Sequence, residues 1–188
     1  MPYSKTIQTV KQTMLETHQA LKHWFDKPQK ALQYRPYNQG WSIQEVLEHI
    51  TLTNHYLMII IRKGRDKAIK RMQAGINVEE GESDLKRLWS IGQAGSFQWH
   101  RPDHMEPTGN VPIEEVKQKL QQQHEECLQI LDSMPHGEGA LYKVRMSVQN
   151  LGKIDMYQWL YFLVLHQKRH LTQIERVWNE WKADRDSN

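Results

Sequence analysis

His166 and His170 are the two residues whose type and spacing best suit metal chemistry in this sequence. Residues four apart on a helix share a face, with their Cβ atoms about 5–6 Å apart. Two nitrogens bound to one zinc ion lie about 3.3 Å apart, given bonds of about 2.0–2.1 Å and tetrahedral angles. Neighbouring imidazoles can lean together by that much, so the pair could chelate one divalent ion. The same spacing also arises by chance on exposed helix faces, where it has no such role.

His49 is the third candidate ligand. It is in helical register with Val46 and Ile50, which places it on the inward face of its helix. A third imidazole from a facing helix would complete a three-histidine set and leave coordination positions open for water or substrate. We therefore predict that His49, His166 and His170 bind one divalent metal ion.

Other polar residues near these histidines receive smaller roles. Gln173 lies about one turn beyond His170 and is expected to hold a ligand imidazole through its outer ring N–H. Glu48 adjoins His49 but faces another direction, so a solvated carboxylate is expected there. Cys127 is expected to be a small core residue. The sequence places no carboxylate clearly as a general base, so catalytic residues are left unassigned, and no site for an organic cofactor is recognised.

The remaining histidines compete less well for a metal role. His100 and His104 also lie four apart, but Pro102 between them argues against a shared helical face. His124 and His136 are expected at the surface or in a turn.

Four helical patterns must position the three candidate ligands. They cover about residues 4–25, 42–73, 112–134 and 154–183. Ser42 is a good N-cap for the second, and Glu45 three residues later predicts a capping box. Alternation over Leu141–Val148 predicts a short extended segment before the last helix.

A Gly- and Pro-rich connection of about residues 75–111 separates the second and third helices. Irregular loops longer than about 12–15 residues are uncommon unless functional or disordered, but a four-helix bundle with a crossover contains one. Asp84–Trp89 could form a short helical turn within it. Trp89, Phe97 and Trp99 could line the mouth of a substrate pocket.

Composition excludes several classes of protein. The 188 residues suit a single domain, 1–188. A formal charge of +3, from 25 basic and 22 acidic residues, is too balanced for a nucleic-acid footprint. The longest apolar run, Tyr157–Leu165, is shorter than the roughly 20 residues that a membrane span needs. With one cysteine and no visible signal peptide, we expect a soluble cytoplasmic protein without nucleic-acid or membrane partners.

Two motifs resemble the DinB-like superfamily. Gly40–Ile50, Gly-Trp-Ser-Ile-Gln-Glu-Val-Leu-Glu-His-Ile, looks like the start of its second helix, where a Trp-Ser/Thr step precedes a histidine. His166–Ile174 looks like its last-helix signature, His-x3-His-x2-Gln-Ile. The resemblance implies an all-α, four-helix up-down-down-up bundle with a long crossover connection between the second and third helices. It also implies a three-histidine metal site, whose ligands map onto His49, His166 and His170.

The same resemblance suggests what the protein does. It implies one divalent ion per chain, nickel or zinc first, and a homodimer. Characterised relatives include thiol-dependent S-transferases that use low-molecular-weight thiols, as well as hydrolases. A metal-dependent enzyme of one of these types, acting on a small molecule, is therefore expected. The alternative is a non-catalytic metal-binding or dimeric scaffold protein.

Overall fold

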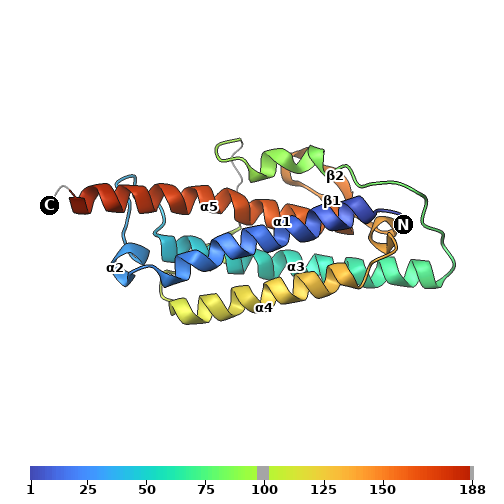
Figure 1. Ribbon diagram of the computed structural model, residues 1–188, viewed down its shortest axis with the longest axis horizontal. Coiled ribbons are helices and arrows are strands. Elements are labelled where there is room, and N and C mark those ends of the chain that lie inside the picture. The colour runs from blue at the N-terminus through green and yellow to red at the C-terminus, as the bar shows by residue number, and fades with distance from the viewer. Residues whose placement is uncertain (97–101, 187–188) are drawn as a thin grey trace.

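Four long helices and a small sheet form the molecule in this computed structural model, which describes residues 1–96 and 102–186. The long helices are α1 (Ser4–Lys22), α3 (Ile43–Gln73), α4 (Ile113–Asp132) and α5 (Met156–Asp186), and α2 is a short turn at Gln29–Leu32. They lie alongside one another, with the N-terminus and the C-terminus at opposite ends of the long axis (Figure 1). This mostly helical architecture agrees with the predicted all-α fold class.

The start of α3 is set by the predicted capping box. The Glu45 backbone N–H donates to the Ser42 hydroxyl at 3.2 Å, and the Ser42 N–H donates to a Glu45 carboxylate oxygen at 2.7 Å. Two backbone donors that the helix itself cannot use are thereby satisfied. The box fixes where α3 begins, and therefore on which face of it His49 lies.

The start of α5 differs from the sequence expectation by two residues. Lys143–Met146 forms β1, as the alternating pattern predicted, but it pairs antiparallel with β2 (Gly152–Asp155), which was not predicted. Ile154 faces Val144 in this ladder and is therefore in a strand, not in the helix. Asp155 and Gln158 then cap α5 by exchanging backbone-to-side-chain hydrogen bonds at 2.9 and 3.0 Å.

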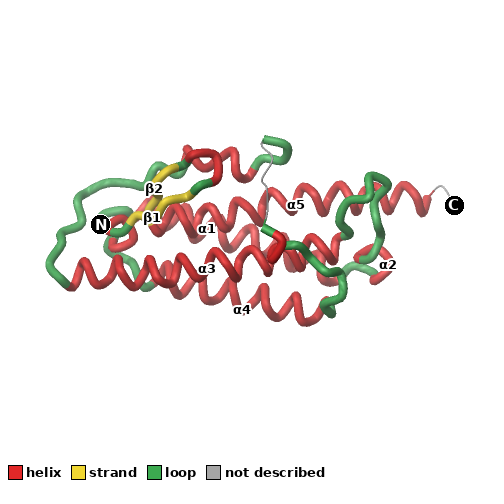
Figure 2. Tube along the Cα trace, turned by 180° about the vertical axis from the view of Figure 1, so that it is seen from behind, coloured by secondary structure: helices red, strands yellow, loops and turns green. Residues whose placement is uncertain are grey.

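The connection between α3 and α4, described for residues 74–96 and 102–112, runs back along the bundle (Figure 2). It contains two 3-10 turns, Lys86–Gly92 and Asp103–Met105. The first, which overlaps the predicted turn, buries Leu88 and Ile91 completely. Each such side chain contributes about 1.5–3 kcal/mol relative to leaving it in water. The second turn lies beside α3, where it reaches the histidines.

Two hydrophobic clusters flank the histidines along α5. The first cluster includes Phe162–Leu165, and the second includes Leu171, Ile174 and Val177. His166 and His170 therefore lie between two well-packed regions, which hold the α5 backbone firmly at that point. No helix in the described part of the chain is long and apolar enough to span a membrane.

Candidate metal centre

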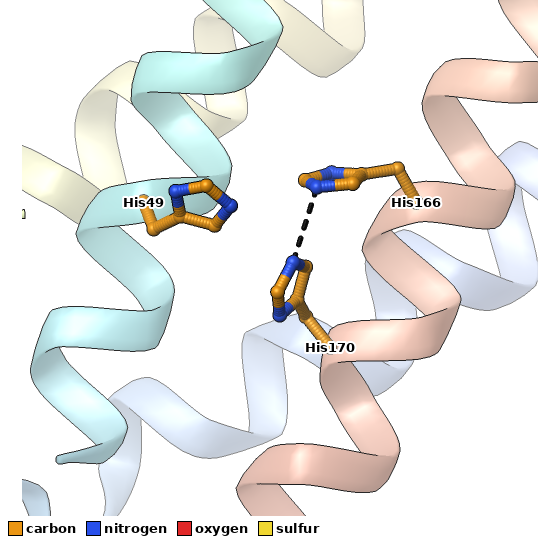
Figure 3. A group of neighbouring side chains, drawn as sticks. All are labelled: His49, His166 and His170. Atoms are coloured by element: carbon orange, nitrogen blue, oxygen red, sulfur yellow. Dashed lines mark hydrogen bonds between the residues drawn. The ribbon is translucent and has the colours of Figure 1, made fainter. Parts of the chain in front are cut away.

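Three buried histidines converge between α3 and α5 (Figure 3). His49 comes from α3, and His166 and His170 come from α5; their exposed fractions are 3%, 1% and 7%. One ring nitrogen of each lies within 4.8 Å of those of the other two. No other group of three His, Cys, Asp or Glu residues within 1–96 and 102–186 meets the same condition. The structure thus brings together the three residues that the sequence selected.

The distance between the two α5 histidines fits a shared ion. Their Nε2 atoms are 3.1 Å apart, close to the value of about 3.3 Å for two nitrogens on one tetrahedral zinc. This contact has the geometry of a hydrogen bond and is drawn as the dashed line in Figure 3. The two imidazoles would therefore be placed to hold one ion between them.

Outer hydrogen bonds fix which nitrogen the rings of His49 and His170 turn inward. The Nδ1 of His49 is 2.7 Å from the carbonyl oxygen of Met105, and the Nδ1 of His170 is 2.8 Å from the side-chain oxygen of Gln173. Each acceptor requires an N–H on Nδ1, which leaves Nε2 with its lone pair directed to the centre. Such outer partners orient metal-binding imidazoles and select their tautomer. The predicted contact of Gln173 is confirmed.

His166 is held in the neutral form that a ligand needs. Burial lowers its pKa well below 6.5, and the neighbouring His170, His49 and Arg169 lower it further. A protonated imidazole nitrogen cannot bind a metal ion, so the low pKa keeps His166 itself able to serve as a ligand.

A cavity of about 350 Å³ opens onto the histidines. Its wall contains Trp41, whose ring centroid lies 4.7 Å from that of His49, and the Thr53 hydroxyl, 3.4 Å from the His49 Nε2. No Asp or Glu is among the described residues that line it, which are Gln39, Gly40, Trp41, His49, Thr53, Met105, His166, Arg169, His170 and Gln173. Sequence reasoning had not assigned Thr53, Met105 or Arg169 to the site, although Thr53 and Arg169 lie near the ligands in the chain.

Glu48 corrects a sequence expectation. It is 2% exposed, not solvated. Its two oxygens accept hydrogen bonds from the Thr108 N–H at 2.9 Å, the Thr108 hydroxyl at 3.0 Å and the Gly109 N–H at 2.9 Å. Gly109 has a φ of +72°, a backbone conformation that favours glycine. Glu48 therefore holds the chain just beyond Met105, whose carbonyl oxygen orients His49.

Trp89, the one aromatic residue of this expectation within the described residues, lies elsewhere than expected. Trp89 lines a pocket, but one formed with Lys5 and Tyr161, not the histidine cavity. The ring of His104 lies 4.1 Å from that of Tyr56, and His104 does not line the histidine cavity. Phe97, Trp99 and His100 lie outside the described residues.

Cys127 lies where the sequence predicted, and His124 does not. Cys127 is 3% exposed, as predicted, and burial raises the pKa of its thiol to about 12, so it stays protonated. His124 was expected at the surface or in a turn. It is instead half-buried on α4, with its ring parallel to that of His18 on α1 at 3.8 Å between centroids. His136 is exposed, as predicted.

Comparisons with known proteins agree with this arrangement. The family model of the DinB superfamily matches residues 7–174. The chain is also 24% identical over 165 residues to an uncharacterized protein, YuaE, of Bacillus subtilis (strain 168), covering 87% of this chain and 91% of that protein. No solved structure is a significant match.

Proposed function

The chain belongs to the DinB superfamily, and from that premise we propose that it is a divalent-metal-dependent enzyme that transfers a group between a small molecule and a low-molecular-weight thiol. The observation that carries this proposal is the convergence of three buried imidazoles on one cavity. His49, His166 and His170 would hold the ion, nickel or zinc first. Because all three ligands are neutral, they would leave the charge of the ion undiminished.

An ion bound there would supply a Lewis acid that favours the deprotonated form of a thiol or a water molecule at the open face. The residues that line the cavity would position the reactants. Trp41 and Met105 exclude water from one side, and the Thr53 hydroxyl can hold an incoming group by a hydrogen bond. In the transfer, the thiol loses its proton to solvent and its sulfur bonds to the electrophilic carbon. The leaving group departs with the electron pair of the broken bond.

The lining of the cavity favours thiol transfer over hydrolysis. Hydrolysis is commonly assisted by a positioned general base, and no carboxylate lines the cavity among the described residues. A thiol needs less help, because its ordinary pKa of about 8.5 is far closer to neutrality than that of water, about 15.7. Hydrolysis is the second candidate, since three neutral imidazoles can also hold a zinc ion that activates water.

We also propose the up-down-down-up helix order and a homodimer, following the superfamily. Figure 1 supports the helix order: α1 and α5 run toward the end of the bundle where α2 lies, and α3 and α4 run in the opposite direction. Light scattering would measure the mass of the particle against the 22.4 kDa of one chain.

The experiment that tests the function compares metal-loaded and chelated protein. Protein loaded with nickel or zinc is assayed with low-molecular-weight thiols and a chromogenic electrophile, and separately with a p-nitrophenyl ester. We expect thiol transfer that disappears on chelation and returns with the ion. Turnover that is indifferent to chelation would contradict the proposal. Bound metal that raises the melting temperature without any turnover would instead support the scaffold alternative.

A further inference from the structure

A second cavity adjoins the histidine cavity. Its volume is about 280 Å³, and its walls are formed by Ala94, Gly95, Arg169, His170, Thr172, Gln173 and Arg176. Three of these residues, Arg169, His170 and Gln173, also line the histidine cavity. The two hollows therefore share a wall, and a small molecule could occupy both.

The residues of the second cavity that come from α5 have a regular spacing. Thr172, Gln173 and Arg176 lie three, four and seven residues after Arg169, so the four residues share one face of the helix. Seven residues of α-helix rise about 10 Å. The two arginines thus bracket the cavity, Arg169 beside the metal centre and Arg176 about two turns further on.

The chemistry of this lining is that of an oxyanion site. Both arginines carry a permanent charge at neutral pH and present planar sets of N–H donors. The Thr172 hydroxyl and the Gln173 amide can add uncharged donors. No Asp or Glu lines either cavity among the described residues. On the opposite wall Ala94 has only a methyl group and Gly95 has no side chain, so room is left for a ligand.

We propose that this arginine cavity is an anion subsite. It binds a carboxylate or phosphate group of the low-molecular-weight thiol whose sulfur lies at the three histidines. The proposal rests on the proposed function and names the class of reactant. Arg176 is exposed, and exposed arginines are ordinarily only solvated. Here it shares a hollow with the half-buried Arg169, and two guanidinium groups around one hollow favour an oxyanion.

Two thiols of similar size test the charge preference. Zinc-loaded protein is titrated calorimetrically, at physiological ionic strength, with 3-mercaptopropionate and with the neutral 2-mercaptoethanol. We expect the anionic thiol to bind about tenfold more tightly, the effect of a charge-assisted hydrogen bond that is partly exposed. Arg176→Gln should bring the ratio of the two Kd values to within about twofold. Arg169→Lys should lower it partly, because a lysine keeps the charge but not the planar set of donors.

Lys168→Gln is the matched control. Lys168 is an exposed cation on the same helix that lines neither cavity. Its loss changes the net charge by the same amount as Arg176→Gln, so the ratio of the two Kd values should stay as in the wild type. Equal binding of the two thiols by the wild type would overturn the subsite, and so would an equal effect of the control variant.

A second measurement separates failure of the subsite from failure of the metal function. Metal-free protein is modified with phenylglyoxal, with and without inorganic phosphate or acetate, and the modified arginines are mapped by mass spectrometry. We expect both anions to slow the modification of Arg169 and Arg176. They should not slow that of Arg185, an exposed arginine near the end of α5 that lines neither cavity. Stronger protection by phosphate than by acetate would favour a phosphorylated reactant. Protection without metal binding would support the subsite and contradict the metal function. Metal binding with no protection would overturn the subsite alone.

Discussion

The bundle contains two groups of histidines, and each group lies between two helices. His18 on α1 faces His124 on α4, and His49 on α3 faces the pair on α5. In the first group the rings are stacked in parallel, with centroids 3.8 Å apart and an interplanar angle of 3°. In the second group the rings are inclined by 60° to 72° to one another, so that their edges, which carry the nitrogens, meet at one point.

The outer hydrogen bonds of the two groups also engage different ring nitrogens. At the candidate metal centre they engage Nδ1 of His49 and of His170 and leave Nε2 inward. At the stacked pair, Gln121 accepts a hydrogen bond from the Nε2 of His18 at 2.8 Å, using the nitrogen that a metal would otherwise reach. Proximity and burial of imidazoles are thus common to both groups. The direction of their nitrogens distinguishes a candidate ligand set from a packing contact.

The largest expected difference between the two groups is in metal affinity. His166→Ala removes a ligand that no neighbour can replace, and we expect the affinity for zinc to fall by more than about 100-fold, beyond the range for losing an outer partner. His18→Ala should leave it within about twofold. Competition with a chromogenic chelator measures both, after circular dichroism has shown that the variants are folded. Stoichiometric zinc bound to His166→Ala would contradict the assignment of His166 as a ligand.

The connection between α3 and α4 passes the candidate metal centre, where Glu48 holds its backbone at Thr108 and Gly109. Substituting Glu48 tests how much this contact stabilises the protein. In Glu48→Gln one acceptor oxygen is replaced by an amide group that faces backbone donors. We expect the free energy of unfolding of the metal-free protein to fall by about 2 kcal/mol, the cost of unsatisfied buried donors. Urea unfolding measures it. Glu125→Gln, an exposed change beside the stacked pair, should cost less than about 0.5 kcal/mol, and equal losses would refute the proposed role of Glu48.

Two glutamines test the outer hydrogen bonds directly, since each contacts one histidine of one group. Gln173→Ala frees the His170 ring to turn, and we expect zinc affinity to fall about tenfold. Gln121→Ala makes the same change at His18 and should leave zinc affinity unchanged. The chelator competition used for the ligand variants applies here as well. A similar effect of the two substitutions would show that the outer contacts do not orient the ligands.

The stacked pair should be visible in the pH dependence of stability. Burial lowers the pKa of His124 from 6.5 to about 4, with repulsion from His18 and Lys22 and a smaller opposing effect of Glu125. As the pH falls below about 6.5, the unfolded chain therefore takes up a proton that the folded chain does not. The stability contribution of the neutral ring is complete above that pH and is lost toward pH 4.

We expect this loss to reach about 1 kcal/mol between pH 7 and pH 5, after allowing for solvent screening of a half-buried ring. Urea unfolding of the wild type and of His124→Gln at the two pH values measures it. The difference between them isolates His124 from the other histidines. A variant with the pH dependence of the wild type would show that His124 does not titrate differently in the folded state.

Local patterns predicted most of the helices and the pairing of two of the three candidate ligands. The spacing of His166 and His170 is a property of one helix, so four residues of separation suffice to bring the rings together. The capping box at Ser42 and the contact of Gln173 with His170 are local in the same way. Each depends on residues within one turn, and the structure confirms both.

Features that depend on distant segments were missed or misjudged. β2 exists because it pairs with β1, and its sequence alone reads as the start of a helix. Glu48 reads as a surface carboxylate until residues sixty positions away supply its donors. Likewise, Trp89 belongs to a pocket formed with α1 and α5 that its own surroundings in the sequence do not indicate.

The sequence by itself determined the types of the ligands, the pairing of His166 with His170 and the inward register of His49. The packing of α3 against α5 decided that the third imidazole meets the other two. The tertiary structure also decided the direction of the His49 ring, because the carbonyl that orients it lies fifty-six residues away. Helical periodicity fixes which face a residue occupies, but only contacts between distant segments fix which nitrogen it turns to a neighbour.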